Sequence, residues 1–271
     1  MSYHTVIVPL DLSPVAEHRV KLAGSLADRF DARLIGVAAQ PFNPPVTGDA
    51  MFFDPRLVED EQHRIRDELA QTEAVFRRWA GTRNNIEWRS AIGAPATYLA
   101  EQARAADLIV VSRQGESDPF DWRFGVSPGE VLMSAGRPVL VVPPHIDYLS
   151  TRRILIAWKD TREARRAVWD ALPLLKAAEE VFVVAVGRET NLAAAEDVAE
   201  YLVRHGIDST TTLHREPAAS VEDKILEMPE WDGADLIISG AYGHSRLREW
   251  MFGGVTRELL NRAPVCCLMS H

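Results

Sequence analysis

Short runs of apolar residues without a polar face recur along the first half of the chain. They occupy residues 6–10, 34–39, 108–111 and 139–142. Strands that are apolar on both faces are typical of a parallel sheet covered by helices on both sides. Between the second and third runs lies a helical stripe, which steps by four and three residues through Ile65, Leu69, Thr72, Phe76 and Trp79. This alternation predicts an α/β fold with doubly wound sheets.

The same order of elements returns in the second half. The segment Ala-Asp-Leu-Ile-Val-Val-Ser at 106–112 reappears as Ala-Asp-Leu-Ile-Ile-Ser at 234–239. A second helical stripe follows the strand at 153–157 and passes through Ala164, Val168, Ala171, Leu172 and Leu175. We expect Thr161 to cap the start of this helix, with Glu163 adding negative charge to its first turn.

Two prolines, Pro143 and Pro144, close the last strand of the first half and begin a short linker. We therefore predict two tandem domains, residues 1–146 and 151–271. One segment breaks the symmetry between them, a proline-rich insertion over residues 40–58. It is either a surface loop packed on the body or a lid or partner surface, and the sequence leaves both open.

Composition and charge indicate which partners and which cellular compartment to expect. The net charge is −9, so no basic excess exists to neutralise nucleic acid or an anionic membrane. No apolar stretch approaches the roughly 20 residues of a membrane helix, and no secretory signal is visible. The two cysteines, Cys266 and Cys267, are neighbours in one predicted strand and point to opposite faces. We expect a soluble protein of the reducing cytoplasm, without nucleic-acid or membrane partners.

Two pairs of glycines suggest where the chemistry lies. Gly240 and Gly243 directly follow the predicted strand at 236–239. Nine residues later, Gly253 and Gly254 precede a predicted helix at 255–261. Glycines at a strand end let the backbone approach a ligand, and the free N–H groups of a helix start favour an anion. The alternative is that these glycines are ordinary turn and cap residues.

The spacing Gly240-x2-Gly243-x9-Gly253, followed by Gly254, resembles the ATP-binding signature of universal stress proteins, G-x2-G-x9-G-[ST]. The resemblance extends over both halves of the chain. It implies a phosphate site made by the loop and by the end of the first strand of the second domain. The residues that it assigns to cofactor binding are Gly240, Gly243, Gly253, Gly254, Val255, Thr256, Ala157 and Lys159.

The resemblance also implies an architecture. Each domain would be an open five-stranded parallel sheet of strand order 3-2-1-4-5, with helices on both faces. The last strands of the two domains would pair inside one chain, Val139–Val142 with the segment that starts at Val265 and ends at Met269. Whether two chains pair further into a homodimer stays open.

Two departures from the family pattern concern the second domain. The family's Ser or Thr after the third glycine is Gly254 here, so one hydroxyl contact to phosphate is lost. The family often has an aspartate at the end of the first strand, and Asp11 fits that position in the first half. Its counterpart in the second half is Lys159, which cannot accept a hydrogen bond but is able to reach a phosphate as a point charge.

The first half carries a weaker copy of the loop, in which Ser112 replaces the first glycine. Its weaker candidates for nucleotide binding are Asp11, Gly115, Gly125 and Ser127. Asp118 and Asp121 lie between the two glycines and oppose an anion by like charge. We therefore expect this loop to bind nucleotide poorly or not at all.

Three classes of function remain. We favour a nucleotide-binding stress regulator that holds ATP or AMP, with or without Mg²⁺, in the C-terminal domain and acts through partner proteins. A slow ATPase is the second class, but no general base and no metal-ligand spacing stands out, so we predict no catalytic and no metal-binding residue. The third class is a nucleotide-independent module that binds partners or ligands. No P-loop, dinucleotide fingerprint or hydrolase elbow is found.

Overall fold

Ten parallel or antiparallel strands make up the sheet of the computed structural model, which describes residues 2–43, 55–116, 118, 121, 123–186, 192–214, 220–243 and 254–271. The strands of the first half are β1 (Thr5–Pro9), β2 (Arg33–Gln40), β3 (Ile86–Ile92), β4 (Leu108–Ser112) and β5 (Val139–Val142). Those of the second half are β6 (Arg153–Ala157), β7 (Glu180–Val186), β8 (Thr210–His214), β9 (Leu236–Gly240) and β10 (Cys266–Ser270).

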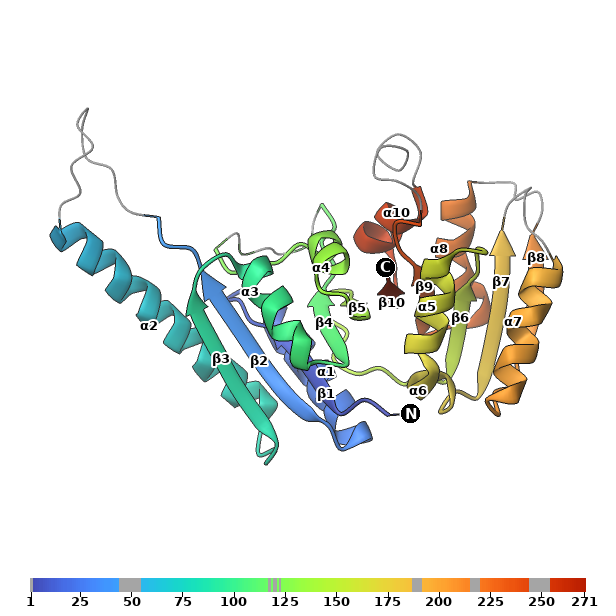
Figure 1. Ribbon diagram of the computed structural model, residues 1–271, viewed down its shortest axis with the longest axis horizontal. Coiled ribbons are helices and arrows are strands. Elements are labelled where there is room, and N and C mark those ends of the chain that lie inside the picture. Colours follow the sequence, from blue (N-terminus) through green and yellow to red (C-terminus); the bar gives the residue numbers. More distant parts are fainter. Residues whose placement is uncertain are drawn as a thin grey trace.

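These strands form one continuous sheet in the order β3-β2-β1-β4-β5-β10-β9-β6-β7-β8 (Figure 1). Read from its outer edge toward the centre, each half has the order 3-2-1-4-5 that the family resemblance implied, so this prediction is confirmed. The pairs within each half are parallel. Within each half, the carboxyl ends of the parallel strands lie at the same edge of the sheet. The glycine-containing loop of that half follows a strand at this edge.

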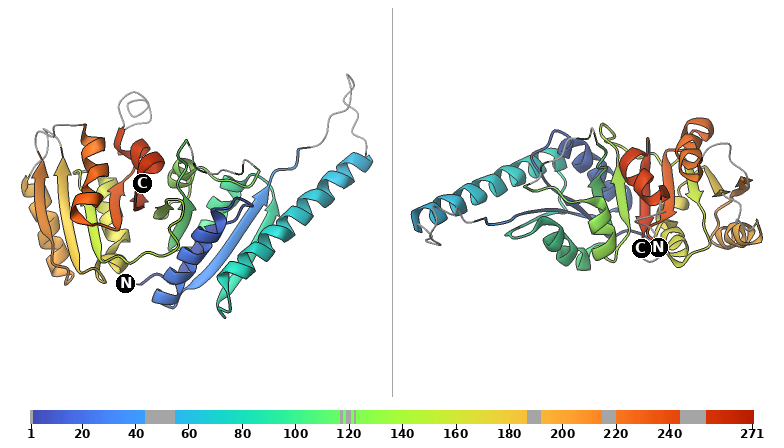
Figure 2. Two further views of the ribbon diagram at one scale, coloured as in Figure 1. Left: turned by 180° about the vertical axis from the view of Figure 1, so that it is seen from behind. Right: turned by 90° about the horizontal axis from the view of Figure 1, so that it is seen from above.

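Helices cover both faces of the sheet (Figure 2). One face carries α1 (Ala16–Phe30), α2 (Pro55–Ala80), α5 (Arg162–Asp170), α6 (Leu172–Leu175) and α7 (Leu192–Arg204). The other carries α3 (Pro95–Gln102), η1 (Ala103–Ala105), α4 (Pro128–Ser134), α8 (Val221–Asp232) and α10 (Gly254–Arg262). Alternate side chains of the inner strands therefore enter one of two cores, and this explains why those strands have no polar face, whereas the edge strands β3 and β8 are only partly buried.

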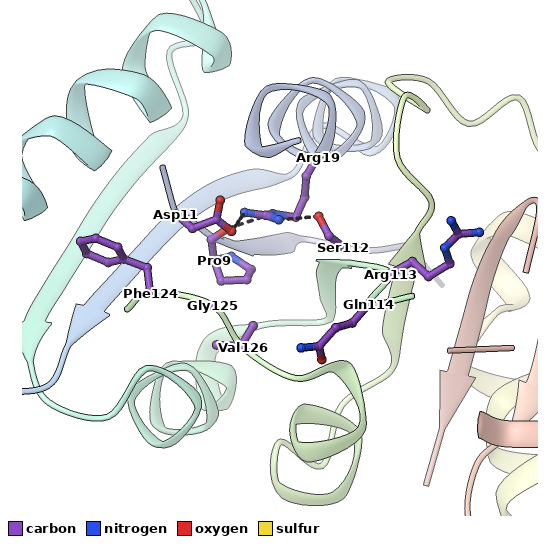
Figure 3. A pocket seen from close by; sticks show the side chains of 9 residues that line it. All are labelled: Pro9, Asp11, Arg19, Ser112, Arg113, Gln114, Phe124, Gly125 and Val126. Carbon is purple, nitrogen blue, oxygen red and sulfur yellow. Dashed lines mark hydrogen bonds and ion pairs between the residues drawn. The ribbon is translucent and has the colours of Figure 1, made fainter. Parts of the chain in front are cut away.

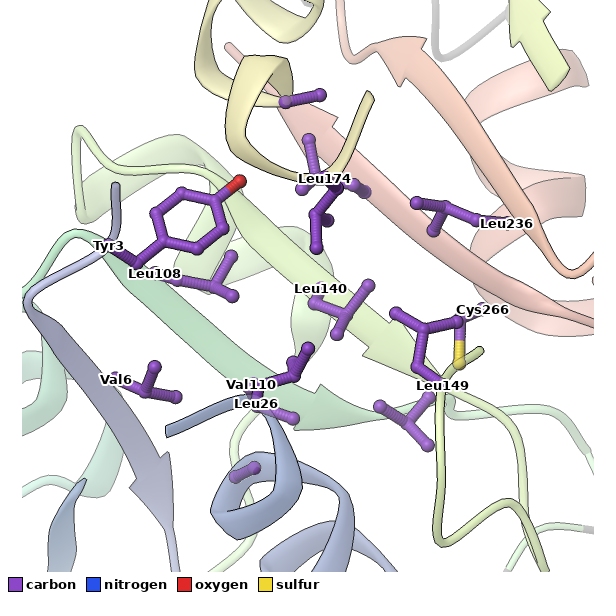
Figure 4. Close-up of a cluster of buried hydrophobic side chains, with 14 of the residues drawn as sticks. Tyr3, Val6, Leu26, Leu108, Val110, Leu140, Leu149, Leu174, Leu236 and Cys266 are labelled. Carbon is purple, nitrogen blue, oxygen red and sulfur yellow. The ribbon is translucent and has the colours of Figure 1, made fainter. Parts of the chain in front are cut away.

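The two halves share a core at the centre of the sheet. β5 and β10 run antiparallel, with Leu268 opposite Leu140 and Cys267 opposite Val141. Pairing of the last strands is thereby confirmed, with β10 beginning and ending one residue later than expected. Leu140 and Leu268 are fully buried in one cluster. Figure 4 shows Leu140 in this cluster beside residues of both halves, among them Leu108 and Leu236. Tyr3 adds a link, because its hydroxyl donates to the carbonyl oxygen of Asp170 at 2.7 Å.

The predicted cap of α5 is observed, whereas one predicted helix and the predicted insertion have different bounds in the structure. Thr161 caps α5, since its Oγ1 accepts from the backbone N–H of Ala164 at 3.3 Å. The second helical stripe, predicted as one helix, is divided into α5 and α6 at Ala171, just before Pro173, which has no N–H to donate. The insertion predicted over 40–58 is narrower, because Gln40 still belongs to β2 and α2 begins at Pro55.

Most of the insertion, residues 44–54, lies outside the described residues, so the choice between a packed loop, a lid and a partner surface stays open. Among the helices that the structure describes, none is long and apolar enough to cross a membrane.

Candidate functional site

The two glycine-rich ends of the second-domain loop meet at the carboxyl end of β9. Gly240 closes that strand and Gly254 opens α10. The backbone N–H of Tyr242 approaches Oγ1 of Thr256 at 3.4 Å, and this contact ties the segment after β9 to the first turn of α10. Val255 packs beside them against the core of this face. Gly253, together with His244, Arg246 and Arg248, falls within 244–253, outside the described residues.

Ala157 and Lys159 reach the same edge from the neighbouring strand. Ala157 ends β6 and lies in register with Ser239 of β9, so the chain that follows it emerges beside the loop. Trp158 is 7% exposed and packs into the core, which agrees with a packing role. Lys159 comes next, at the position that Asp11 holds in the first half. The predicted residues that are described therefore share one edge of the second domain.

Gly240 has a structural reason to be glycine that needs no ligand. A Cβ placed on it would lie 2.5 Å from the backbone nitrogen of Ala164 and 2.8 Å from the carbonyl carbon of Glu163. The first turn of α5 thus presses directly on the end of β9. At Gly254 the obstacle is different, because the three atoms nearest to an added Cβ all belong to the side chain of Glu222.

This difference leads to a pair of matched predictions. Gly240→Ala should lower the free energy of unfolding by about 1–3 kcal/mol, because backbone must move to admit the methyl group. Gly254→Ala should cost less than about 1 kcal/mol, because the end of Glu222 can rotate away and alanine suits a helix better than glycine. Urea denaturation of both variants measures the difference. Equal destabilisation of both would contradict the close packing of α5 on β9.

Two carboxylates flank the second-domain loop. Glu163, on the first turn of α5, is 2% exposed, and its Oε2 lies 3.1 Å from the Cβ position of Gly243 without a hydrogen-bond partner. Burial raises the pKa of Glu163, but hydrogen bonds, first from Arg162, outweigh this and hold the pKa below its usual range. Glu222 reaches the start of α10 from α8. Both negative charges oppose an anion in the loop unless a cation accompanies it.

Tyr242 links the second-domain loop to the first half. Its backbone φ of 55° is left-handed, which is uncommon for a residue with a side chain. Its hydroxyl lies 2.7 Å from the Cβ position of Gly129 in α4. The ring of His271 lies edge-on to the ring of Tyr242, and its Nδ1 is 3.1 Å from the carbonyl oxygen of Ala241. Tyr242 therefore has neighbours in both domains.

In the first domain, Asp11 belongs to a buried ion pair. Its Oδ2 lies 2.7 Å from Nη2 of Arg19, and their side chains are 11% and 3% exposed. Arg19 also donates to the carbonyl oxygen of Pro9 at 3.0 Å and to Oγ of Ser112 (Figure 3). Burial raises the pKa of Asp11, but Arg19 and Ser13 outweigh it and lower the pKa. Asp11 is thus engaged with the protein itself.

The first-domain loop leaves little room beside this pair. The pocket there is lined by Pro9, Asp11, Arg19, Ser112, Arg113, Gln114, Phe124, Gly125 and Val126 (Figure 3). It encloses about 20 Å³, which is room for about one water molecule. Phe124 is 2% exposed and joins the core of the α1 face. Ser127 precedes α4 at its cap position without a side-chain cap hydrogen bond.

Comparison with known proteins identifies the relatives of this arrangement. The model of the universal stress protein family matches residues 2–143 and again residues 150–271. The chain belongs to the universal stress protein family. A universal stress protein of Synechocystis sp. is 25% identical over 168 residues, which are 59% of this chain and 56% of that relative. The match therefore spans little more than half of the relative's length.

Solved structures agree on the fold. A universal stress protein from Archaeoglobus fulgidus superposes with a TM-score of 0.72 at 16% identity, covering 98% of this chain and 95% of that one. A universal stress protein in complex with cAMP is 28% identical and covers 53% of this chain and 99% of its own, with a TM-score of 0.37. That score is too low to place its ligand in this chain.

The universal stress protein signature found the loop but not the acidic side chains around it. Glu163 was visible only as a charge in the first turn of a helix. Glu222 gave no signal, because it lies far from Gly254 along the chain, on a different helix. Within the described part of the chain, no group of three or more His, Cys, Asp and Glu side chains is placed to hold a metal ion.

Proposed function

We propose that this universal stress protein binds an adenine nucleotide, ATP or AMP, in its C-terminal domain and acts as a stress regulator through partner proteins. The observation that carries the proposal is the contact between Tyr242 N and Thr256 Oγ1, which brings the strand end and the start of α10 together. A phosphate at this place would meet the positive end of a helix and backbone close enough to approach it. The two domains, 1–146 and 151–271, would thus differ in ligand binding.

The surrounding charges favour a nucleotide that arrives with Mg²⁺. Glu163 and Glu222 place negative charge beside Gly243 and Gly254, so a bare polyphosphate would be repelled. Carboxylate oxygens are ligands that Mg²⁺ accepts, and Glu163 Oε2 has no hydrogen-bond partner. Recognition would then rest on backbone N–H groups, on Lys159 and on the metal. The two free, buried cysteines fit a cytoplasmic setting.

Calorimetric titration with ATP and Mg²⁺, and separately with AMP, tests the proposal on three variants. Gly243→Asp places a charge where the phosphate should lie. Two like charges 4 Å apart repel by roughly 4 kcal/mol at an effective dielectric of 20, so binding should weaken at least about tenfold. Gly243→Ala controls for bulk, since its Cβ meets its nearest atom at 3.1 Å. Gly93→Asp adds the same charge at a position with nothing within 4 Å.

The wild type, Gly243→Ala and Gly93→Asp should bind with similar affinity. Unchanged binding by Gly243→Asp would place the nucleotide elsewhere. Binding by none of the proteins would instead favour the nucleotide-independent interaction module, the second candidate. The observation in favour of that candidate is the presence of a carboxylate at each loop, Glu163 in the second domain and Asp118 in the first.

A further inference from the structure

The first-domain loop holds a carboxylate of its own chain with a donor set suited to phosphate. Arg113 donates two parallel hydrogen bonds to Asp118, from Nε to Oδ2 at 2.8 Å and from Nη2 to Oδ1 at 2.9 Å. The backbone N–H of Gly115 donates to the same Oδ2 at 2.7 Å. A two-pronged guanidinium combined with a loop N–H is the arrangement by which proteins bind phosphate oxygens.

The pair is largely shielded from water. The side chains of Arg113 and Asp118 are 19% and 8% exposed. Hydrogen bonds from Arg113 lower the pKa of Asp118, against the effect of burial, so the carboxylate is charged. Asp118 therefore does more than repel an anion, because its carboxylate lies where the donors of Arg113 and Gly115 would hold one.

The donors do not depend on Asp118 for their position. Nη1 of Arg113 donates to the carbonyl oxygen of Ala263 at 2.8 Å, just beyond the end of α10. The backbone N–H of Arg113 donates to Val142 at 2.7 Å. Gly115 lies so close to α10 that a Cβ on it would be 2.5 Å from the carbonyl oxygen of Asn261. The second domain thus keeps both donors in place, and removal of the carboxylate would leave them preorganised.

We propose that Arg113 and Gly115 form a second anion site, for a phosphate group or a phosphorylated small molecule, which Asp118 closes by occupying it. An intramolecular carboxylate competes at a high effective concentration, so an external phosphate loses to it in the wild type. Removal of the charge would open the site. This site is separate from the nucleotide site proposed for the second domain.

The other acidic residue of the loop provides a matched control. Asp121 pairs with Arg123 at 3.2 Å, and Arg123 also pairs with Glu68 of α2 at 2.8 Å. None of these contacts involves Arg113 or Gly115. Asp121→Ala therefore removes the same charge from the same loop but leaves Asp118 bound to Arg113 and Gly115.

The test is calorimetry with inorganic phosphate, in a Gly243→Asp background that removes the proposed second-domain site. Asp118→Ala should bind phosphate at least about tenfold more tightly than the background protein. Asp121→Ala should show no gain, and Asp118→Ala with Arg113→Gln should lose it. Asp118→Asn, which keeps the shape and removes the charge, serves if Asp118→Ala does not fold, and it should show a gain in the same direction.

Two results would overturn the proposal. One is phosphate affinity of folded Asp118→Ala or Asp118→Asn no higher than that of the background. The other is an equal gain in Asp121→Ala, which would assign the effect to net charge. Because every protein in the series lacks the second-domain site, the outcome does not depend on whether that domain binds nucleotide. Circular dichroism establishes that each variant is folded.

Discussion

Asp11→Ala is expected to lower the free energy of unfolding by about 3–5 kcal/mol, because it leaves the Arg19 guanidinium buried without its counter-charge. Arg19 is 3% exposed and lies 2.7 Å from the Asp11 carboxylate. Since the folded-state pKa of Asp11 is lowered, the pair stabilises the protein above the unfolded pKa of about 3.9 and loses this effect as pH falls through the folded pKa. Urea denaturation at neutral and acidic pH measures both effects.

Two controls separate the buried pair from ordinary surface charge. Asp28→Ala removes an ion pair with Arg83 whose side chains are 56% and 26% exposed, so its cost should stay below about 1 kcal/mol. The double variant Asp11→Ala with Arg19→Met should recover much of the lost stability, because it removes both charges. If Asp11→Ala costs no more than Asp28→Ala, the buried pair of Asp11 and Arg19 does not stabilise the fold more than a surface pair does.

Leu268→Ala should cost about 2–5 kcal/mol, the range for a cavity in a well-packed core. Leu268 is fully buried and lies in register with Leu140 across the junction of the halves. The double variant with Leu140→Ala should cost less than the sum of the single variants, since the two side chains share one core cluster. Val203→Ala, at a position 55% exposed, should change stability by less than about 0.5 kcal/mol.

Thermal or urea unfolding of these variants shows whether the sheet is one cooperative unit. Unfolding of both halves in one transition is the expected result in the wild type, with a lower midpoint in Leu268→Ala. A variant as stable as Val203→Ala would show that the centre of the sheet contributes little, and that the halves are joined by the linker alone.

The fold could be predicted well because its signals are local or repeated. Strands without a polar face identify a parallel sheet, and the repeat of residues 106–112 at 234–239 shows that two units follow the same order. Thr161 was recognisable as a cap because capping depends on the next three residues. The end of the insertion was less predictable, because Pro55 opens α2 at a position where proline is tolerated.

At the candidate site, the sequence predicted where the backbone turns but not which charged side chains surround it. Glycine spacing located the strand end and the helix start, because the distance along the loop is fixed by the sequence itself. The charges around it come from elements that meet only in the folded chain: Glu222 from α8 reaches Gly254 of α10, and Arg113 reaches Ala263 of the other domain. The burial of Arg19 was equally hidden, since its partner lies eight residues away, before α1 begins.

We propose that each chain holds one adenine nucleotide, at the second-domain loop. Native mass spectrometry of the full chain in excess ATP and Mg²⁺ counts bound nucleotides directly, beside Gly243→Asp and Gly93→Asp. One nucleotide per chain is predicted for the wild type and for Gly93→Asp, and none for Gly243→Asp. Two nucleotides per chain, none on the wild type, or one retained by Gly243→Asp would contradict the claim.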